Sequence, residues 1–211
     1  MTNVLIVEDQ SMARQLFEMF VHMSRNYNLV KAIMDADMAD YYCERNQIDL
    51  ILMDICTDMD SSGLDASARI KERFPHIKII VVTSMPEYSY LKRAREIGVD
   101  SFWYKEVNEE PILELMDRTM AGERIFPDTT PEIRLGEASS YDMTERELDV
   151  LREMTSGETN AEIAEQLNLS PGTIKTHIQN MLQKTGFKTR TELAVRARQT
   201  GLVIKERGKK D

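Results

Sequence analysis

Polar or charged residues follow four short apolar runs of the chain, at points where buried strands would end. The types are an acid pair, a further acid, a hydroxyl pair and a lysine. They are Glu8 and Asp9 after residues 4–7, Asp54 after 50–53, Thr83 with Ser84 after 79–82, and Lys105 after 101–104. Three carboxylates brought close together repel one another unless a cation lies among them, and their hard oxygen atoms suit Mg²⁺. A carboxylate beside Mg²⁺, a lysine and a threonine hydroxyl is suited to attack a phosphoryl group and form an acyl phosphate.

A second chemical pattern lies in residues 171–184, near the C-terminal end. Four apolar side chains at i, i+4, i+7 and i+8 from Ile174 would form the buried face of a helix. Another face carries Lys175, Thr176 and Gln179, which can pair with base edges in the major groove of DNA. Further basic or hydroxyl side chains are candidates for contacts to DNA phosphates, which position a protein without specifying sequence. These candidates are Thr173, Lys184, Lys188 and Arg190.

The first 121 residues alternate between short apolar runs and stretches with helical spacing. Strands are expected at 4–7, 29–34, 50–53, 79–82 and 101–104. Because these runs are almost continuously apolar and helices separate them, we expect an α/β fold with a doubly wound, five-stranded parallel sheet. The carboxyl ends of parallel strands lie at one edge of a sheet, so the residues that follow them can converge. One carboxylate after a strand is commonly a solvated loop residue, and only the joint pattern favours a site.

From residue 142 to 211 strand patterns are absent and helix starts recur. The segment from Thr144 to Glu147 predicts a capping box, and the same pattern begins at Thr159 and Thr189. Four short helices predict a smaller all-α domain, whose closely spaced middle pair forms a helix-turn-helix. Residues 122–141 are rich in glycine, proline and serine, which indicates a linker. We therefore expect domains at 1–121 and 142–211, joined by a linker at 122–141.

The net charge of the 211-residue chain, −9, argues against nucleic-acid binding only if it is spread evenly. Residues 1–121 carry −8, whereas residues 168–211 carry +7. This asymmetry is typical of an acidic domain fused to a nucleic-acid-binding one. No apolar run approaches the roughly 20 residues that a membrane span needs, and the first run meets acids at once, unlike a signal peptide. With two cysteines and no CxxC spacing, we expect a cytoplasmic protein with free thiols and no membrane partner.

The acidic half resembles the receiver domain of bacterial two-component response regulators. The matching segments are 4–9, 52–54, 81–84 and 102–105. The resemblance implies the strand order 2-1-3-4-5, a phosphoacceptor at Asp54, and Mg²⁺ held by Glu8, Asp9, Asp54 and the backbone carbonyl of Cys56. It also implies that Thr83 binds a phosphoryl oxygen, that Phe102 is the aromatic switch residue and that Lys105 pairs with the phosphate.

The loop after Asp54 departs from the family pattern. Asp54 and Gly63 are nine residues apart, where the family spacing is eight, and the loop lacks the usual proline and gains two acids. We expect its conformation, and the access of phosphodonors, to be altered. Cys56 and Met85, each two positions after a site residue, offer no carboxylate or amide to orient an attacking water. We therefore expect autodephosphorylation that takes minutes or more.

Residues 142–203 resemble the LuxR-type helix-turn-helix of the NarL/FixJ subfamily. The match runs through 143–147, 160–164, 169–170, 173–177 and 184–186. The resemblance implies that 171–184 is the recognition helix, with Lys175, Thr176 and Gln179 facing bases. It also implies that the last helix, at about 190–200, carries a dimer contact, so that a homodimer binds two related half-sites of double-stranded DNA.

Together, these patterns predict a phosphorylation-controlled transcriptional regulator. A sensor histidine kinase would phosphorylate Asp54, and shifts of Thr83 and Phe102 would favour dimerisation and binding to promoter DNA. The output is binding, so we do not expect an enzyme. One alternative is a regulator controlled by a ligand or partner without phosphorylation, given the altered loop. The other is a magnesium-dependent phosphohydrolase, disfavoured because only Asp58 and Asp60 could supply a second acid–base carboxylate near Asp54.

Overall fold

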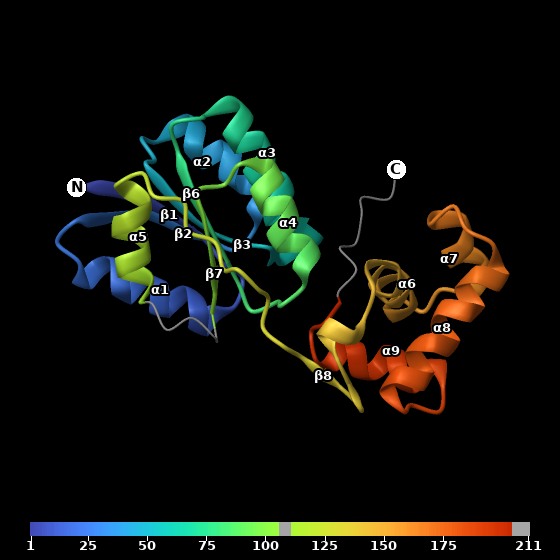
Figure 1. The fold of residues 1–211 in the computed structure, drawn as a ribbon. Coiled ribbons are helices and arrows are strands. Elements are labelled where there is room, and N and C mark those ends of the chain that lie inside the picture. Colours follow the sequence, from blue (N-terminus) through green and yellow to red (C-terminus); the bar gives the residue numbers. More distant parts are fainter. Residues whose placement is uncertain (106–110, 204–211) are drawn as a thin grey trace. The chain divides into compact units, whose positions relative to one another are not determined.

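A computed structural model describes residues 1–105 and 111–203 of the chain (Figure 1). It divides into two compact units, one of residues 1–84 and 88–129 and another whose described residues are 85–87 and 130–203. The first unit is an α/β fold and the second is helical, which confirms the predicted fold classes. Among the described helices, none is long and apolar enough to cross a membrane.

The first unit is built on a five-stranded sheet in which every neighbouring pair of strands is parallel. Its strand order is β2-β1-β3-β6-β7. Since β6 and β7 are the fourth and fifth strands of this sheet along the chain, the predicted order is confirmed. The bounds are Thr2–Val7 for β1, Tyr27–Ile33 for β2, Leu50–Asp54 for β3, Lys78–Thr83 for β6 and Ser101–Tyr104 for β7.

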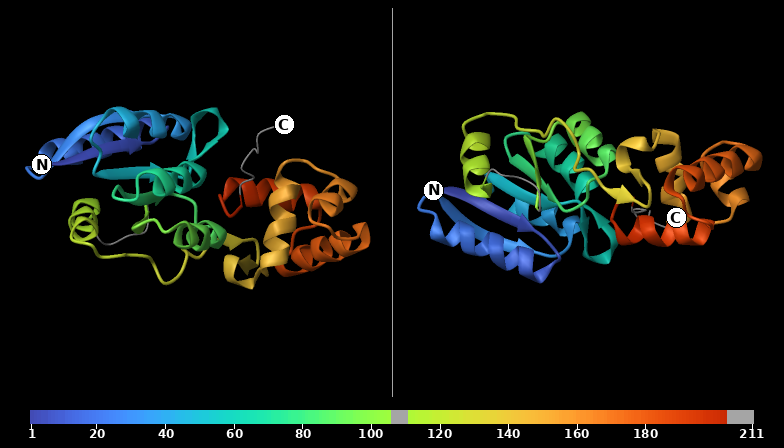
Figure 2. Two further views of the ribbon diagram at one scale, coloured as in Figure 1. Left: turned by 90° about the horizontal axis from the view of Figure 1, so that it is seen from above. Right: turned by 60° about the horizontal axis from the view of Figure 1, so that its bottom comes forward.

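Helices cover both faces of this sheet, with α1 and α5 on one face and α2, α3 and α4 on the other (Figure 1, Figure 2). Side chains alternate along each strand, so Val4 and Ile6 share one core cluster with Phe17 of α1 and Leu115 of α5. Leu5 points to the opposite face and is also fully buried. Burial on both faces explains why the strands are almost continuously apolar. The bounds are Ser11–Met23 for α1, Ala39–Arg45 for α2, Gly63–Arg73 for α3, Tyr88–Ile97 for α4 and Ile112–Met120 for α5.

A small hairpin follows Asp54 where the sequence predicts an altered loop. Strands β4 (Cys56–Thr57) and β5 (Ser61–Ser62) pair antiparallel, joined by the 3-10 turn η2 (Asp58–Asp60). The chain then enters α3 at Gly63, where a Cβ atom would lie 1.8 Å from the backbone oxygen of Asp54. Only glycine allows this close approach, so Gly63 fixes the end of the hairpin against the end of β3.

In the second unit, helices pack around one core together with a hairpin of β8 and β9. Leu135 and Ala138 of this hairpin are buried in the same cluster as Leu151, Ile163 and Leu193 of the helices. The hairpin lies within the segment expected to be a linker, so part of that segment packs with the helical unit. The bounds are Arg134–Leu135 for β8, Ala138–Ser139 for β9, Glu145–Thr155 for α6, Asn160–Gln166 for α7, Pro171–Thr185 for α8 and Arg190–Gln199 for α9.

The helix starts of this unit follow the predicted capping pattern with one difference. Thr144 and Thr159 each form a complete capping box with the glutamate three residues on. At Thr189 the hydroxyl accepts from the N–H of Glu192 at 3.1 Å, but the Glu192 carboxylate accepts from the N–H of Lys188. The hydroxyl half of the capping box is therefore present at Thr189. The Glu192 carboxylate accepts instead from the neighbouring backbone N–H of Lys188.

Candidate functional site

The carboxyl ends of two adjacent strands bring three carboxylates together. Glu8 and Asp9 follow β1, and Asp54 ends β3, which pairs with β1. One oxygen atom of each of the three acids lies within 4.8 Å of the others. Glu8 and Asp54 are buried and Asp9 is half-buried. The parallel sheet thus assembles acids that are separated by 45 positions or more in the sequence, apart from the adjacent pair.

Lys105 reaches the same cluster from the end of β7. Its Nζ atom lies 2.5 Å from Glu8 Oε2 and 3.2 Å from Asp54 Oδ2. The backbone N–H of Lys105 donates to the carbonyl of Thr83 at 2.9 Å, which ties the end of β7 to the end of β6. Thr83 is buried beside these groups at the same edge of the sheet. One ammonium group faces three carboxylates, so the cluster keeps an excess of negative charge.

The Asp54 carboxylate is held between two donors. Its Oδ1 accepts from the N–H of Ile55 at 2.9 Å, while its Oδ2 faces Lys105. Burial raises the pKa of Asp54 above its ordinary value, which Lys105 opposes and the neighbouring Glu8 reinforces. A divalent cation in the cluster would favour the ionised carboxylate, the form that can act as a nucleophile.

The donor set of this cluster fits Mg²⁺. Oδ1 of Asp9 is buried and has no hydrogen-bond partner within the described parts of the chain. Buried polar atoms are normally paired, so an unpartnered carboxylate oxygen among other carboxylates is suited to binding a cation. Mg²⁺ prefers oxygen ligands and keeps several waters, which a half-exposed acid permits. Cys56, whose carbonyl the family resemblance makes a further ligand, begins β4 two residues after Asp54.

Arg14 of α1 belongs to this site, although it was not among the residues predicted from the sequence. Its Nη1 atom donates to the backbone oxygens of Glu8 and Asp9, at 2.9 and 3.0 Å. The N–H of Gln10 donates to Oε1 of Glu8 at 3.1 Å. Arg14 therefore fixes the turn that carries the acid pair. The only signal in the sequence was a basic residue in the first turn of the helix that follows the acids.

The second candidate site is α8, the longest helix of the described chain. Its predicted apolar face is buried, since Ile174, Ile178 and Met181 are all 6 % exposed or less. Ser170 caps the helix by accepting from the N–H of Thr173 at 3.1 Å. Because Pro171 occupies the first helical position, its missing N–H leaves no intrahelical bond unmade.

The polar face of α8 is open to solvent. Lys175, Thr176 and Gln179 are exposed, as a helix that enters a DNA groove requires. The Thr176 hydroxyl donates to the carbonyl of Gly172 at 3.1 Å, so its methyl group is the part most available to a base. These three side chains lie on adjacent positions of the helix surface and can act together.

Two of the predicted phosphate-contacting cations are held within the second unit. Lys184 Nζ donates to the carbonyl of Asp142 at 2.8 Å and to Oε2 of the buried Glu147 at 2.7 Å. Arg190 donates to Oδ1 of Asn160 and to the carbonyl of Glu158, each at 2.7 Å. These contacts join α8 to α6 and α9 to α7. The remaining two candidates differ, since Lys188 is exposed and Thr173 is half-buried at the start of α8.

Comparisons with known proteins agree with both sites. Residues 4–117 match the family described as response regulator receiver domain, and residues 142–197 match bacterial regulatory proteins, luxR family. The response regulator protein VraR of Staphylococcus aureus (strain NCTC 8325 / PS 47) is 32% identical over 205 residues, which cover 95% of this chain and 98% of the relative. The chain belongs to the response regulator family. VraR of Staphylococcus epidermidis (strain ATCC 12228 / FDA PCI 1200) is also 32% identical over 205 residues, with the same coverage of both chains.

Solved structures show the same fold as this response regulator. The structure of RcsB from Salmonella enterica serovar Typhimurium, bound to promoter P1flhDC with a phosphomimetic, matches with a TM-score of 0.62 at 20% identity. The match covers 96% of this chain and 99% of that one. A receiver followed by a LuxR-type DNA-binding domain makes the protein a phosphorylation-controlled transcription regulator and not an enzyme. The phosphohydrolase alternative is therefore set aside.

Phe102 of this response regulator lies in β7, three residues before Lys105. It is 1 % exposed, and its ring centroid lies 5.0 Å from that of Tyr104 in an edge-on arrangement. Trp103 between them packs against the core formed with α1 and α5, so Phe102 and Tyr104 point to the other face of the sheet. This buried aromatic pair lies next to the turn that carries Lys105.

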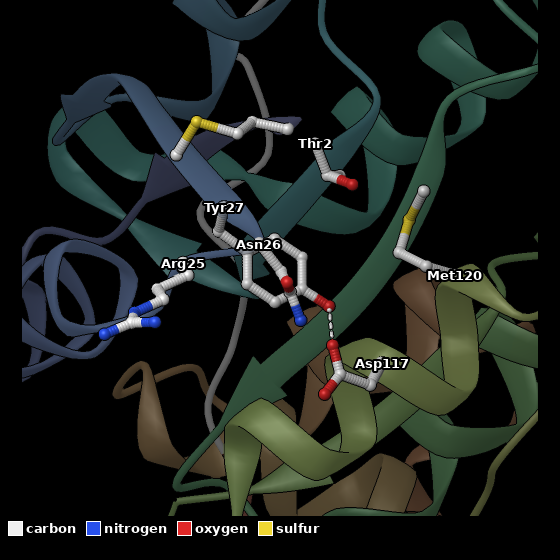
Figure 3. A pocket seen from close by; sticks show the side chains of 7 residues that line it. Thr2, Arg25, Asn26, Tyr27, Asp117 and Met120 are labelled. Carbon is white, nitrogen blue, oxygen red and sulfur yellow. Dashed lines mark hydrogen bonds between the residues drawn. The ribbon is translucent and has the colours of Figure 1, made fainter.

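An open pocket of about 380 Å³ lies at the amino ends of β1 and β2 (Figure 3). Thr2 at the start of β1 and Tyr27 at the start of β2 line it, together with Asp117 of α5. The Tyr27 hydroxyl donates to Asp117 Oδ1 at 2.7 Å. Since the amino ends of the strands form this pocket, it is not part of the carboxylate site.

Proposed function

We propose that this response regulator accepts a phosphoryl group on Asp54 from a sensor histidine kinase and then binds promoter DNA as a homodimer. The observation that carries the proposal is the position of Asp54, which lies in a cluster of three carboxylates with Lys105 Nζ 3.2 Å away. Family membership supports the receiver role, and the exposed polar face of α8 supports the DNA-binding role.

In the proposed transfer, an Asp54 carboxylate oxygen attacks the phosphorus of a phosphohistidine. The O–P bond forms as the N–P bond breaks, and the histidine ring leaves with its electron pair and takes up a proton. Lys105 neutralises charge on the phosphoryl oxygens, and the Thr83 hydroxyl donates to one of them. Glu8, Asp9, Asp54 and the Cys56 carbonyl would hold Mg²⁺, which when bound supplies further positive charge to those oxygens.

The proposed response begins at the same residues. A phosphoryl group adds negative charge beside Lys105 and attracts the Thr83 hydroxyl, which ends β6. Movement of Thr83 leaves space for the buried Phe102 to adopt another packing, and this shifts the receiver population towards a dimerising state. The contact between paired DNA-binding domains is proposed for α9, where Val195 is 49 % exposed.

DNA recognition is proposed for the N-terminal part and exposed face of α8. Lys175, Thr176 and Gln179 would contact base edges, whereas Thr173 and Lys188 would contact phosphates. Lys184 and Arg190 stay candidates for phosphate contacts, in addition to the bonds they make within the domain. We place the protein in the cytoplasm, because its proposed partners are a kinase domain and chromosomal DNA.

A phosphorylation site at Asp54 is tested by labelling the protein with acetyl phosphate and Mg²⁺. Wild type should gain one phosphoryl group, detected by phosphate-affinity gel shift and by borohydride trapping with mass spectrometry. Asp54→Ala should gain none. Equal labelling of the two proteins would contradict the proposal and would favour control by a ligand or partner, the alternative that the unusual hairpin after Asp54 suggests.

A further inference from the structure

Three exposed methionines border the phosphoacceptor edge of the receiver. Met34 follows β2, Met38 ends the 3-10 turn η1 (Ala36–Met38), and Met59 lies at the tip of the hairpin after Asp54. Their exposed fractions are 48 %, 44 % and 87 %. We refer to these three residues as the methionine rim. The proposed function has no use for them, and solvent-exposed methionines gathered beside a reactive site indicate an interaction surface.

Hydrogen bonds hold the hairpin firmly against the segment that follows β2. The N–H of Asp58 donates to the carbonyl of Met34 at 3.0 Å. The N–H of Ala36 lies 3.0 Å from both the Thr57 and Ser61 hydroxyl oxygens, which are 2.6 Å apart and belong to buried residues. Met59 therefore follows directly on a residue bonded to Met34, and Met38 ends the turn whose first residue, Ala36, is bonded to the hairpin.

Two further backbone hydrogen bonds fix the rim relative to the acidic cluster. The N–H of Glu8 donates to the carbonyl of Ile33, the residue before Met34, at 2.9 Å. At the other end of the hairpin, the N–H of Gly63 donates to the carbonyl of Ile55, the residue after Asp54, at 2.8 Å. The residue before Met34 is thus bonded to Glu8 itself, and the hairpin closes on the residue after Asp54.

We propose that the methionine rim is a docking surface for the phosphodonor protein, the histidine-bearing domain of the kinase. This inference rests on the proposed phosphotransfer to Asp54. Asp54 is 4 % exposed, so a protein-borne phosphohistidine reaches it only if the donor covers the edge of the sheet. A donor seated there contacts the rim, and its matching surface is apolar with basic groups that face the exposed Asp58.

A second copy of this chain fits the rim less well. In a symmetric contact Asp58 would approach its own equivalent, in a domain that already carries a net charge of −8. A small donor such as acetyl phosphate has no need of the rim at all. The surface therefore distinguishes protein donors from small donors, and methionine side chains adapt readily to an irregular partner surface.

The backbone conformation of Met59 allows substitutions that distinguish a docking role from a structural role. Met59 has φ +62°, a left-handed conformation that favours glycine or asparagine over methionine. Replacing Met59 with either residue should leave the hairpin at least as stable, while the apolar side chain is lost. Folding does not favour methionine in this conformation at the most exposed point of the rim, so we attribute the apolar side chain to contact with a partner.

The test compares transfer to Asp54 from two donors, an autophosphorylated kinase fragment and acetyl phosphate. The fragment used is the one that labels wild type fastest among the cytoplasmic kinase domains of the source organism. Met59→Gly and Met59→Asn should each lower the initial rate from the kinase by about tenfold, the loss expected for one apolar anchor. Their rates with acetyl phosphate should stay within about twofold of wild type, and Met59→Leu should retain the rate from the kinase.

Met23→Ala is the matched control, because Met23 is 74 % exposed but lies at the far end of α1, next to the start of β2. It should leave both rates unchanged. Unchanged transfer from the kinase to Met59→Gly and Met59→Asn would overturn the docking proposal, and so would an equal loss with both donors. An altered dimer mass with unchanged transfer would assign the rim to a second copy. Labelling of Asp54→Ala at the wild-type level would instead overturn the proposed function itself.

Discussion

Lys105 Nζ lies between two buried acids, 3.2 Å from Asp54 Oδ2 and closer still to Glu8 Oε2. The ammonium group therefore offsets repulsion among the acids, and in the proposed transfer it would also meet the phosphoryl group on Asp54. Loss of this cation removes both contributions at once.

Replacing Lys105 with methionine, which keeps the length of the stem, should lower the rate of phosphorylation by acetyl phosphate by at least about tenfold, or about 1.4 kcal/mol in the barrier. Phosphate-affinity gels over a time course measure this rate. Lys31→Met, at an exposed position of β2, is the control and should behave as wild type. A Lys105→Met protein that is phosphorylated normally would show that the lysine is only a structural partner of Glu8.

A substitution at Gly63 tests how closely the hairpin packs against the end of β3. A Cβ atom there would lie 1.8 Å from the carbonyl oxygen of Asp54, which is backbone and cannot swing away. Gly63→Ala should therefore lower the free energy of unfolding of the receiver by about 3 kcal/mol or more. Gly172→Ala is the matched control, since its nearest neighbour would be Ser170 Oγ at 3.6 Å, and it should stabilise its helix slightly. Equal thermal stability of the two variants would contradict the described close approach.

The lowered pKa of Asp100 predicts that the stability of the receiver depends on pH. Desolvation would raise the pKa of this acid, but hydrogen bonds from Lys71, Ile79 and Lys78 outweigh it and hold the pKa below its ordinary value. A carboxylate with a lowered pKa stabilises the fold above its unfolded pKa of about 3.9, and this stabilisation is lost as the pH falls through the lower, folded value.

Asp100→Asn should accordingly lower the free energy of unfolding at pH 7 by about 1–3 kcal/mol, the usual worth of hydrogen bonds to a charged group. Below about pH 4 the difference from wild type should shrink, because the unfolded carboxylate takes up a proton before the native one does. Urea unfolding of both proteins between pH 7 and pH 3 measures this difference. A gap that stays constant over that range would contradict a role for the ionised form.

Lys184 and Lys188 distinguish structural from DNA-contacting cations in the second unit. Lys184 is bonded to Glu147 and Asp142, so Lys184→Met should destabilise the domain by about 1–3 kcal/mol. The exposed Lys188 has no such bonds from its side chain among the described contacts, so Lys188→Met should keep stability and reduce the salt dependence of DNA binding by about one phosphate contact. Calorimetric melting and binding titrations at several salt concentrations separate the two effects. Equal effects of the two variants on stability would contradict this assignment.

The phosphorylated protein should lose its phosphoryl group slowly. Cys56 and Met85 occupy the two positions where an acid or amide could orient water, and neither side chain is a strong hydrogen-bond acceptor. We expect a half-life of minutes or more, measured as loss of label after removal of the donor. Cys56→Asn introduces an amide next to the site and should shorten it. A wild-type half-life of seconds would contradict this account.

Much of the receiver follows from local patterns. The apolar run at 50–53 is long enough for one buried strand, and the polar residue that follows it must lie at the carboxyl edge. This reasoning places Asp54, Thr83 and Lys105 at one edge without any knowledge of distances. The strand order did not follow from the pattern of runs, because sequential order says nothing about which strands are neighbours, and it came from the family resemblance.

Contacts between distant segments could not be predicted from the sequence pattern. The hydrogen bonds from Arg14 to the turn that carries Glu8 and Asp9 depend on the angle between α1 and β1. The hydrogen bonds between Ala36 and the hairpin join segments about 20 residues apart. Lys184 and Arg190 were predicted as phosphate contacts because they are basic. Their internal partners, Glu147 and Asn160, are at least 30 positions away and become neighbours only once the helices pack.

The most direct test of the account is DNA binding with and without phosphorylation of Asp54. Wild type and Asp54→Ala are incubated with Mg²⁺, with or without acetyl phosphate, and titrated against duplexes enriched from a random-sequence pool by phosphorylated wild type. Acetyl phosphate should tighten binding of wild type by at least about tenfold, with a shift to dimer mass, and should leave Asp54→Ala unchanged. Identical responses of the two proteins to acetyl phosphate would contradict control through Asp54.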